Sequence, residues 1–297
     1  MNHRRRDLYG YLILVFLLGY GTQMLAVRAG LSQGGRFWVW LTMWTPAVAV
    51  LVVSSRTRKL VRRSFHMRGL RFVPLGIAVG WSQILLTKLF LVLAGRYRWD
   101  TEHFPLATDG NGVAGIHGLG TLLGPNAQSF AYLALNLLLS IALASIVNAV
   151  IGGLGEELGW RVFLQPFLEA RKGPLRGTLL VGLIWAFWHL PANLAGYNDG
   201  AHPIVSTFLL FPAGVVSLAF AFAWLYRYSG GSVWAVAVAH GANNALASGF
   251  VVTGSDWWSD QAASLAASAI LIFLFGFALT RASRNPGGPP AMAEPTP

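Results

Sequence analysis

Residues 204–226 read IVSTFLLFPAGVVSLAFAFAWLY and contain no Asp, Glu, Lys or Arg. A helix of this length can cross the hydrocarbon core of a bilayer, which is about 30 Å thick and takes roughly 20 residues. The whole chain has the same character, since 55% of its 297 residues are hydrophobic and only 11% are charged. Soluble domains carry about 25% charged residues, so this composition excludes an ordinary soluble domain and predicts a membrane protein.

Apolar windows of similar length lie on both sides of residues 204–226. They predict an all-α, polytopic membrane helix bundle with about eight transmembrane helices. We expect residues 1–281 to form one transmembrane domain, whose motif-bearing core covers about 130–252, and the Pro-rich tail 282–297 to be disordered. The predicted spans are 8–27, 37–55, 72–94, 130–157, 177–195, 204–226, 232–252 and 262–281.

The distribution of Lys and Arg predicts how the chain is oriented. Arg4, Arg5 and Arg6 before the first apolar run resemble the start of a signal peptide, but the run is long and no cleavage pattern closes it. We therefore predict a retained first span. If the N-terminus is inside, most basic residues, including those of 56–71 and 171–176, fall in cytoplasmic segments. The sequence thus predicts a multi-pass protein of the cell membrane with both termini cytoplasmic and the loop 95–126 outside.

The net charge of +11 and the absence of cysteine limit the chemistry further. In a membrane protein a basic excess favours contact with the anionic lipid bilayer over nucleic acid, which we do not expect as a partner. The lack of cysteine excludes disulfides, thiolate metal sites and cysteine nucleophiles. Lys88 lies near the outer end of its predicted span, so we expect its ammonium group to reach the interface.

Ionisable residues inside the apolar spans are candidates for function, because charge within hydrocarbon costs at least about 2.5 kcal/mol per group on insertion scales. The motif Gly155-Glu156-Glu157-Leu158-Gly159-Trp160-Arg161 places Glu157 and Arg161 at i, i+4, the favourable order for a helical ion pair. Glu156 is left without an obvious local partner. The alternative interpretation is that both glutamates lie at the cytoplasmic interface and bind water and Arg161.

Two histidines lie in later spans. His189 follows Trp185 by four residues and precedes Pro191, which is expected to kink or end its helix. His240 and Asn244 are spaced i, i+4 and therefore share one helix face. A single histidine of this kind is more often a packing residue than a functional one.

The predicted depth of these ionisable groups in the membrane connects them. Counted from the cytoplasmic ends of their predicted spans, Glu156, His189 and His240 reach a similar level near the inner leaflet if each stretch is helical. Their burial costs would then offset one another. A carboxylate, two imidazoles and an amide brought together favour proton transfer and oxyanion stabilisation, which are the requirements for hydrolysing an amide bond with water.

Taken together, these motifs resemble the CPBP family of intramembrane proteases, which includes the type II CAAX prenyl endopeptidases and the bacterial Abi proteins. The resemblance rests on Glu156-Glu157-x-x-x-Arg161, on an aromatic residue four positions before His189, and on His240-x-x-x-Asn244, and it covers about 150–250. It implies an intramembrane endopeptidase that opens to the cytoplasmic side and acts on a peptide or membrane-protein substrate. The His-Glu-x-x-His, rhomboid-type serine and Gly-x-Gly-Asp motifs of other intramembrane proteases are absent.

The resemblance also implies roles for single residues. Glu156 would activate water with help from His189, and His240 and Asn244 would bind the developing oxyanion. Glu157 and Arg161 would support the site structurally. Trp185 stands where the family usually has Phe, which keeps an aromatic wall but would narrow the substrate cleft.

Two alternatives stay open at this point. Glu156, His189 and His240 could ligate zinc with water in the open position, although we expect no metal or other cofactor, because no two of them have the i, i+4 spacing of a zinc helix. The chain could also be a non-enzymatic membrane protein. It would then be a proton- or cation-coupled transporter or a bacteriocin-immunity-type partner that uses the same buried groups.

Overall fold

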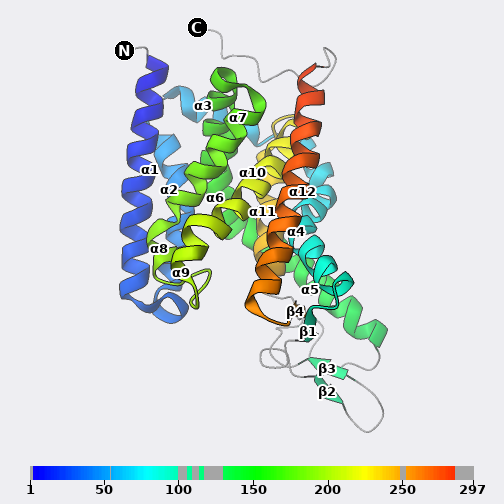
Figure 1. Ribbon diagram of the computed structural model, residues 1–297. Coiled ribbons are helices and arrows are strands. Elements are labelled where there is room, and N and C mark those ends of the chain that lie inside the picture. The colour runs from blue at the N-terminus through cyan, green and yellow to red at the C-terminus, as the bar shows by residue number, and fades with distance from the viewer. Residues whose placement is uncertain are drawn as a thin grey trace.

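The computed structural model describes residues 3–53, 55–99, 106–108, 114–116, 130–247 and 252–284. Within these residues the chain is a bundle of helices with four strands of three residues each (Figure 1). The first half contains α1 (His3–Arg28), η1 (Gly30–Gly34), α2 (Arg36–Val53), α3 (Ser55–Ser64), η2 (Met67–Phe72), α4 (Val73–Leu93), β1 (Tyr97–Trp99), β2 (Leu106–Thr108) and β3 (Ala114–Ile116). The second half contains α5 (Phe130–Asn148), η3 (Ala149–Gly153), α6 (Leu154–Glu157), η4 (Leu158–Leu164), α7 (Gln165–Trp188), α8 (Leu190–Leu194), α9 (Pro203–Val205), η5 (Ser206–Leu210), α10 (Phe211–Tyr228), α11 (Val233–Ala247), β4 (Val252–Gly254) and α12 (Trp257–Arg284).

The predicted helical membrane bundle is confirmed, but the count of eight spans is not. Six helices of the described residues are long and apolar enough to cross a membrane. Two of the predicted spans, 130–157 and 177–195, lie largely in one helical run, Leu135–Trp188, in which Gly173 at φ 76° interrupts the helical geometry. The predicted span 232–252 corresponds to α11, which has only 15 residues.

The short helix α11 lies in the middle of the bundle, where α4, α5 and α10 pack against it. Backbone contact at α11 depends on glycine, because a Cβ on Gly241 would collide with the backbone of Ser145 and Ala149, and one on Gly80 would collide with Ala239. Most of α11 is buried. A helix surrounded by protein in this way need not match the full thickness of the lipid.

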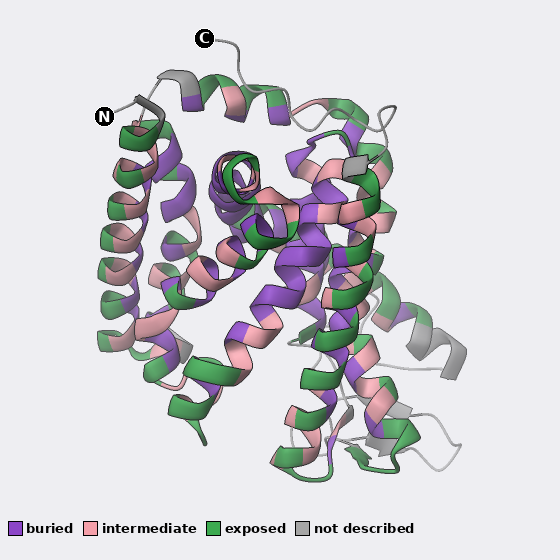
Figure 2. Ribbon diagram, turned by 45° about the horizontal axis from the view of Figure 1, so that its top comes forward, coloured by how far each residue is buried: buried purple, intermediate pink, exposed green. Residues whose placement is uncertain are grey.

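The outer helices expose apolar side chains. Ile13 and Leu17 of α1 and Phe273 of α12 are each about two-thirds exposed or more (66%, 67% and 71%). Figure 2 shows buried residues gathered in the middle of the bundle, with exposed positions along one side of α1 and of α12. These outer helices expose apolar side chains where a soluble protein would expose mainly polar ones. Contact with lipid explains the difference, since hydrocarbon cannot hydrogen-bond to polar groups.

The first residues of α1 and the last residues of α12 lie at the same end of the bundle, together with α3 and the turn of α7 (top of Figure 1). The helix α3 is strongly basic and packs on η4 and α2 through its buried side. The strands lie at the opposite end. Placement of both termini in the cytoplasm is consistent with this arrangement and stays a prediction.

At the end of the bundle with the strands, β1 pairs antiparallel with β4 and β2 with β3. The described parts of the predicted loop 95–126 are therefore mostly short strands. Lys88 forms an ion pair there, with its Nζ 3.5 Å from Oδ1 of Asp260 on the first turn of α12. The helix α12 continues to Arg284, into the tail that was predicted to be disordered, and the rest of that tail lies outside the described residues.

Candidate active site

The two glutamates of the Glu156-Glu157 motif lie on α6, a single α-helical turn between two π-helical segments, η3 and η4. A π-helical segment adds a residue to the turn and so changes which side chains share a face; such segments are frequent at functional sites. The glycines before α6 allow close packing, because a Cβ on Gly153 would meet the carbonyl oxygen of Ala237 on α11 at 2.8 Å. The local sequence thereby brings both carboxylates against α11.

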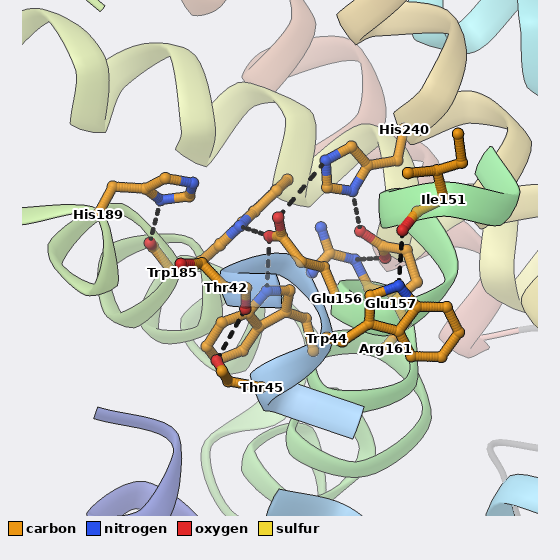
Figure 3. A network of polar contacts seen from close by, with 11 residues as sticks. Thr42, Trp44, Thr45, Ile151, Glu156, Glu157, Arg161, Trp185, His189 and His240 are labelled. Carbon is orange, nitrogen blue, oxygen red and sulfur yellow. Dashed lines mark hydrogen bonds and ion pairs between the residues drawn. The ribbon is translucent and has the colours of Figure 1, made fainter. Parts of the chain in front are cut away.

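Glu156 is 1% exposed, and its carboxylate is held by two indoles and faced by an imidazole. Oε2 accepts hydrogen bonds from Nε1 of Trp160 at 3.1 Å and from Nε1 of Trp185 at 2.6 Å. Oε1 lies 4.0 Å from Nε2 of His240 (Figure 3). The two N–H donors compensate for the water that this buried carboxylate has lost.

Glu157 is fully buried and connects His240 to Arg161. Its Oε1 lies 2.9 Å from Nδ1 of His240, and its Oε2 lies 3.3 Å from Nε of Arg161. A carboxylate on one ring nitrogen of a histidine fixes the orientation of the ring and directs the other nitrogen. His240 thus points its Nε2 at Glu156, and the predicted pairing of Glu157 with Arg161 is present (Figure 3).

Aromatic rings surround the guanidinium group of Arg161. Its Cζ lies 4.9 Å from the centre of the Trp185 ring and 5.4 Å from that of Phe222. Tyr11 of α1 closes the same region, edge-on to Trp160, with its hydroxyl against Gly159. The Glu157 carboxylate and the faces of these rings offset part of the cost of burying this cation.

His189 lies at the junction of α7 and α8, where the backbone leaves the helical geometry at φ −83° and ψ 3°. Its Nδ1 is 2.9 Å from the carbonyl oxygen of Trp185, so Nδ1–H donates to that carbonyl and Nε2 is left for other partners. The ring packs edge-on against Trp188 and Phe211 at 4.7 and 5.0 Å between centroids. Trp185 therefore links His189 to Glu156, through its carbonyl oxygen on one side and its indole on the other.

Asn244 is half-buried on α11, one helical turn after His240, as the i, i+4 spacing predicts. The predicted convergence of Glu156 with His240 is present at 4.0 Å. Trp185 connects His189 to the same cluster. The catalytic roles assigned to these residues stay predictions.

The described residues contain no group of three or more His, Cys, Asp and Glu side chains arranged to hold a metal ion. Two of the three zinc candidates have ring nitrogens in use, since Nδ1 of His240 is paired with Glu157 and Nδ1 of His189 with a backbone carbonyl. Any metal bound by these rings would have to use Nε2 of each.

Three residues of the site were not predicted in their present roles. Trp160 is the i+4 neighbour of Glu156, and that spacing was a readable signal for a partner. The indole of Trp185 was expected to form a wall, but it donates a hydrogen bond to the carboxylate. Tyr11 of α1 gave no signal, since it lies 145 positions before Glu156 in a span without polar motifs.

The fold and the cluster together define a helical membrane bundle with a buried acid and imidazole centre between α6, α7 and α11. A family model described as type II CAAX prenyl endopeptidase Rce1-like matches residues 138–246. The match includes Glu156, Glu157, Arg161, Trp185, His189, His240 and Asn244. It confirms the resemblance to the CPBP family and supports an intramembrane protease of the CAAX type. No curated protein matches the chain.

Proposed function

We propose that this protein is an intramembrane endopeptidase in which Glu156 activates water for attack on a peptide bond. The observation that supports this most is the position of the Glu156 carboxylate. It is buried, two N–H donors hold one oxygen, and the other oxygen faces an imidazole across 4.0 Å. A fixed carboxylate with one oxygen directed at a proton-carrying ring is suited to general-base chemistry.

His240 would stabilise the oxyanion together with Asn244 on the same helix face. Because Nδ1 of His240 donates to Glu157, this role requires a proton on Nε2. Glu157 would then both orient the ring and balance its charge. His189, whose Nδ1 is engaged by a carbonyl, would assist through Nε2. Glu157 and Arg161 are positioning residues in this mechanism, and no step depends on a metal.

The substrate would be a peptide or a segment of a membrane protein that enters from the cytoplasmic side of the bilayer. The basic residues on α3 and on the turn of α7 support this side, because positive charge marks cytoplasmic segments. A prenylated tail fits the name of the matched family.

The first test compares peptide cleavage by purified wild-type protein and by Glu156→Gln in liposomes. The second compares, by proteomics, the peptides in membranes that contain either protein. We expect cleaved peptides only with the wild type and normal insertion of both. Glu169→Gln is the matched control, since Glu169 is also a mostly buried carboxylate but pairs with Arg227 away from the site. Cleavage by Glu156→Gln at the wild-type rate would refute the mechanism. Loss of a pH-linked transport activity, with no peptide cut by either protein, would favour the transporter alternative.

A further inference from the structure

The helix break that carries His189 is completed by side chains of α1, a helix outside the region matched by the family model. Pro191 follows His189 by two residues and has no N–H, so it cannot donate to the carbonyl of Phe187. In the structure the hydroxyl of Tyr20 donates to that carbonyl at 2.9 Å. A side chain of α1 therefore satisfies one backbone carbonyl that the helix break leaves without a helical donor.

Gln23 satisfies the next pair of backbone groups. Its Nε2 donates to the carbonyl of Trp188 at 2.7 Å, and its Oε1 accepts from the backbone N–H of Ala192 at 3.2 Å. In a continuous helix the N–H of Ala192 would donate to the carbonyl of Trp188 directly. The side-chain amide of Gln23 is thus inserted into one rung of the ladder, one of the known physical causes of a kinked helix.

The contact between α1 and this turn is close and buried. Gln23 is 2% exposed, and a Cβ on Gly19 would collide with the indole of Trp188, whose Nε1 donates to the carbonyl of Val15 at 3.1 Å. The inserted amide is consequently shielded from water. Without it, Trp188 and Ala192 would be left with unpaired backbone groups in an apolar region, or the turn would close to a regular helix.

The orientation of His189 depends on this turn, since its ring is anchored to the carbonyl of Trp185 and its backbone lies between Trp188 and Ala192. We propose that Gln23 is a positioning residue, which holds the His189 turn open and so directs Nε2 of His189 toward the catalytic cluster. This inference rests on the proposed function, because it assigns a purpose to the position of His189. A turn that closed by one hydrogen bond would displace the ring, and misplacement by about 1 Å can cost about 10²-fold in rate.

The experiment compares Gln23→Met with Gln83→Met in liposomes. Gln83 is the matched control, because it is also a buried glutamine that donates to a partner on another helix, Ser268, but it does not touch the His189 turn. We expect Gln23→Met to lower kcat by about 10- to 10²-fold with KM unchanged. Gln83→Met should retain the wild-type kcat. Equal effects of the two variants on kcat would overturn the proposal.

A double-mutant cycle with His189→Ala separates a positioning role of Gln23 from a general stabilising role. If Gln23 acts through His189, Gln23→Met should cause no further loss in the His189→Ala background, whereas a purely structural role would lower activity by the same factor in both backgrounds. Tyr20→Phe removes only one hydroxyl at the edge of the same turn. Tyr20→Phe should lower kcat by a smaller factor than Gln23→Met, with KM unchanged. It provides the test if the Gln23→Met protein does not accumulate.

Hydrogen exchange provides a readout that does not require activity. In Gln23→Met the amide of Ala192 should exchange at a changed rate, while the amides of α10 and α12 keep theirs. An unchanged exchange rate at Ala192 would overturn the proposed bridge even in an active enzyme. An inactive wild type with the expected change in exchange would instead leave the bridge in place and refute the proposed function.

Discussion

Nε1 of Trp185 lies 2.6 Å from Oε2 of Glu156, although the two residues are 29 positions apart in the chain. The family that this chain resembles usually has Phe at the position of Trp185, and Phe cannot donate this hydrogen bond. The residue that was expected to narrow a cleft is therefore a direct partner of the proposed base. This pair gives the first prediction.

Trp185→Phe should lower kcat by about 10- to 10²-fold, because a hydrogen bond to a charged group is worth about 1.5–3 kcal/mol and Trp160 alone would hold Oε2. The measurement is kcat on a peptide substrate in liposomes. Trp257→Phe is the control, since Trp257 also donates from its indole to a carboxylate, that of Asp199, at 2.9 Å. A Trp185→Phe enzyme as active as the Trp257→Phe enzyme would show that the hydrogen bond has no catalytic value.

The buried pair of Glu157 and Arg161 should be needed for folding. We expect Arg161→Met to lower the free energy of unfolding in detergent by about 3–5 kcal/mol, because it leaves a carboxylate buried without its counter-ion. The double variant with Glu157→Gln should lose less than the sum of the two single losses. Arg227→Met, at the less buried pair with Glu169, should cost less, because Glu169 keeps the hydrogen bonds that Gln165 and Thr178 donate to it. Equal losses at the two pairs would contradict this.

Asn244→Ala should reduce kcat by about 10²- to 10³-fold, the effect of removing one oxyanion donor. The expected cause is lost stabilisation of the tetrahedral intermediate, so KM should change little. Asn243→Ala is the control, because adjacent positions on a helix point in directions about 100° apart. Unchanged cleavage by Asn244→Ala would remove the role assigned to this residue.

The orientation of the bundle can be tested with single cysteines, since the chain has none. A cysteine in place of Ser255, which is exposed at the end with the strands, should react with a membrane-impermeant maleimide in intact cells. A cysteine in place of Lys172, exposed at the turn of α7, should react only after the membrane is opened. The opposite pattern would place the termini outside and overturn the charge-based assignment.

The sequence alone determined the class of fold and drew attention to the ionisable residues of the candidate site, but not to Trp160 or Tyr11. Apolar windows of about 20 residues or more predict a helical membrane bundle, because a helix of that length spans the hydrocarbon and satisfies its backbone polar groups internally. Helical spacing placed Glu157 beside Arg161, and this local contact is present. The count of eight spans is not confirmed, because two of the predicted spans share one helical run that turns at Gly173, and a third corresponds to the short helix α11.

The tertiary structure alone decided which residues from distant parts of the chain contact each other. Glu157 contacts His240, 83 positions away, and Gln23 contacts the turn at Trp188, 165 positions away. No periodicity in the sequence encodes such pairs, because they depend on how helices cross and on which backbones glycine allows to approach. The charged groups were visible in the sequence because each one is costly in an apolar span. Only the packing of the helices in the structure shows which partner residues offset each of those costs.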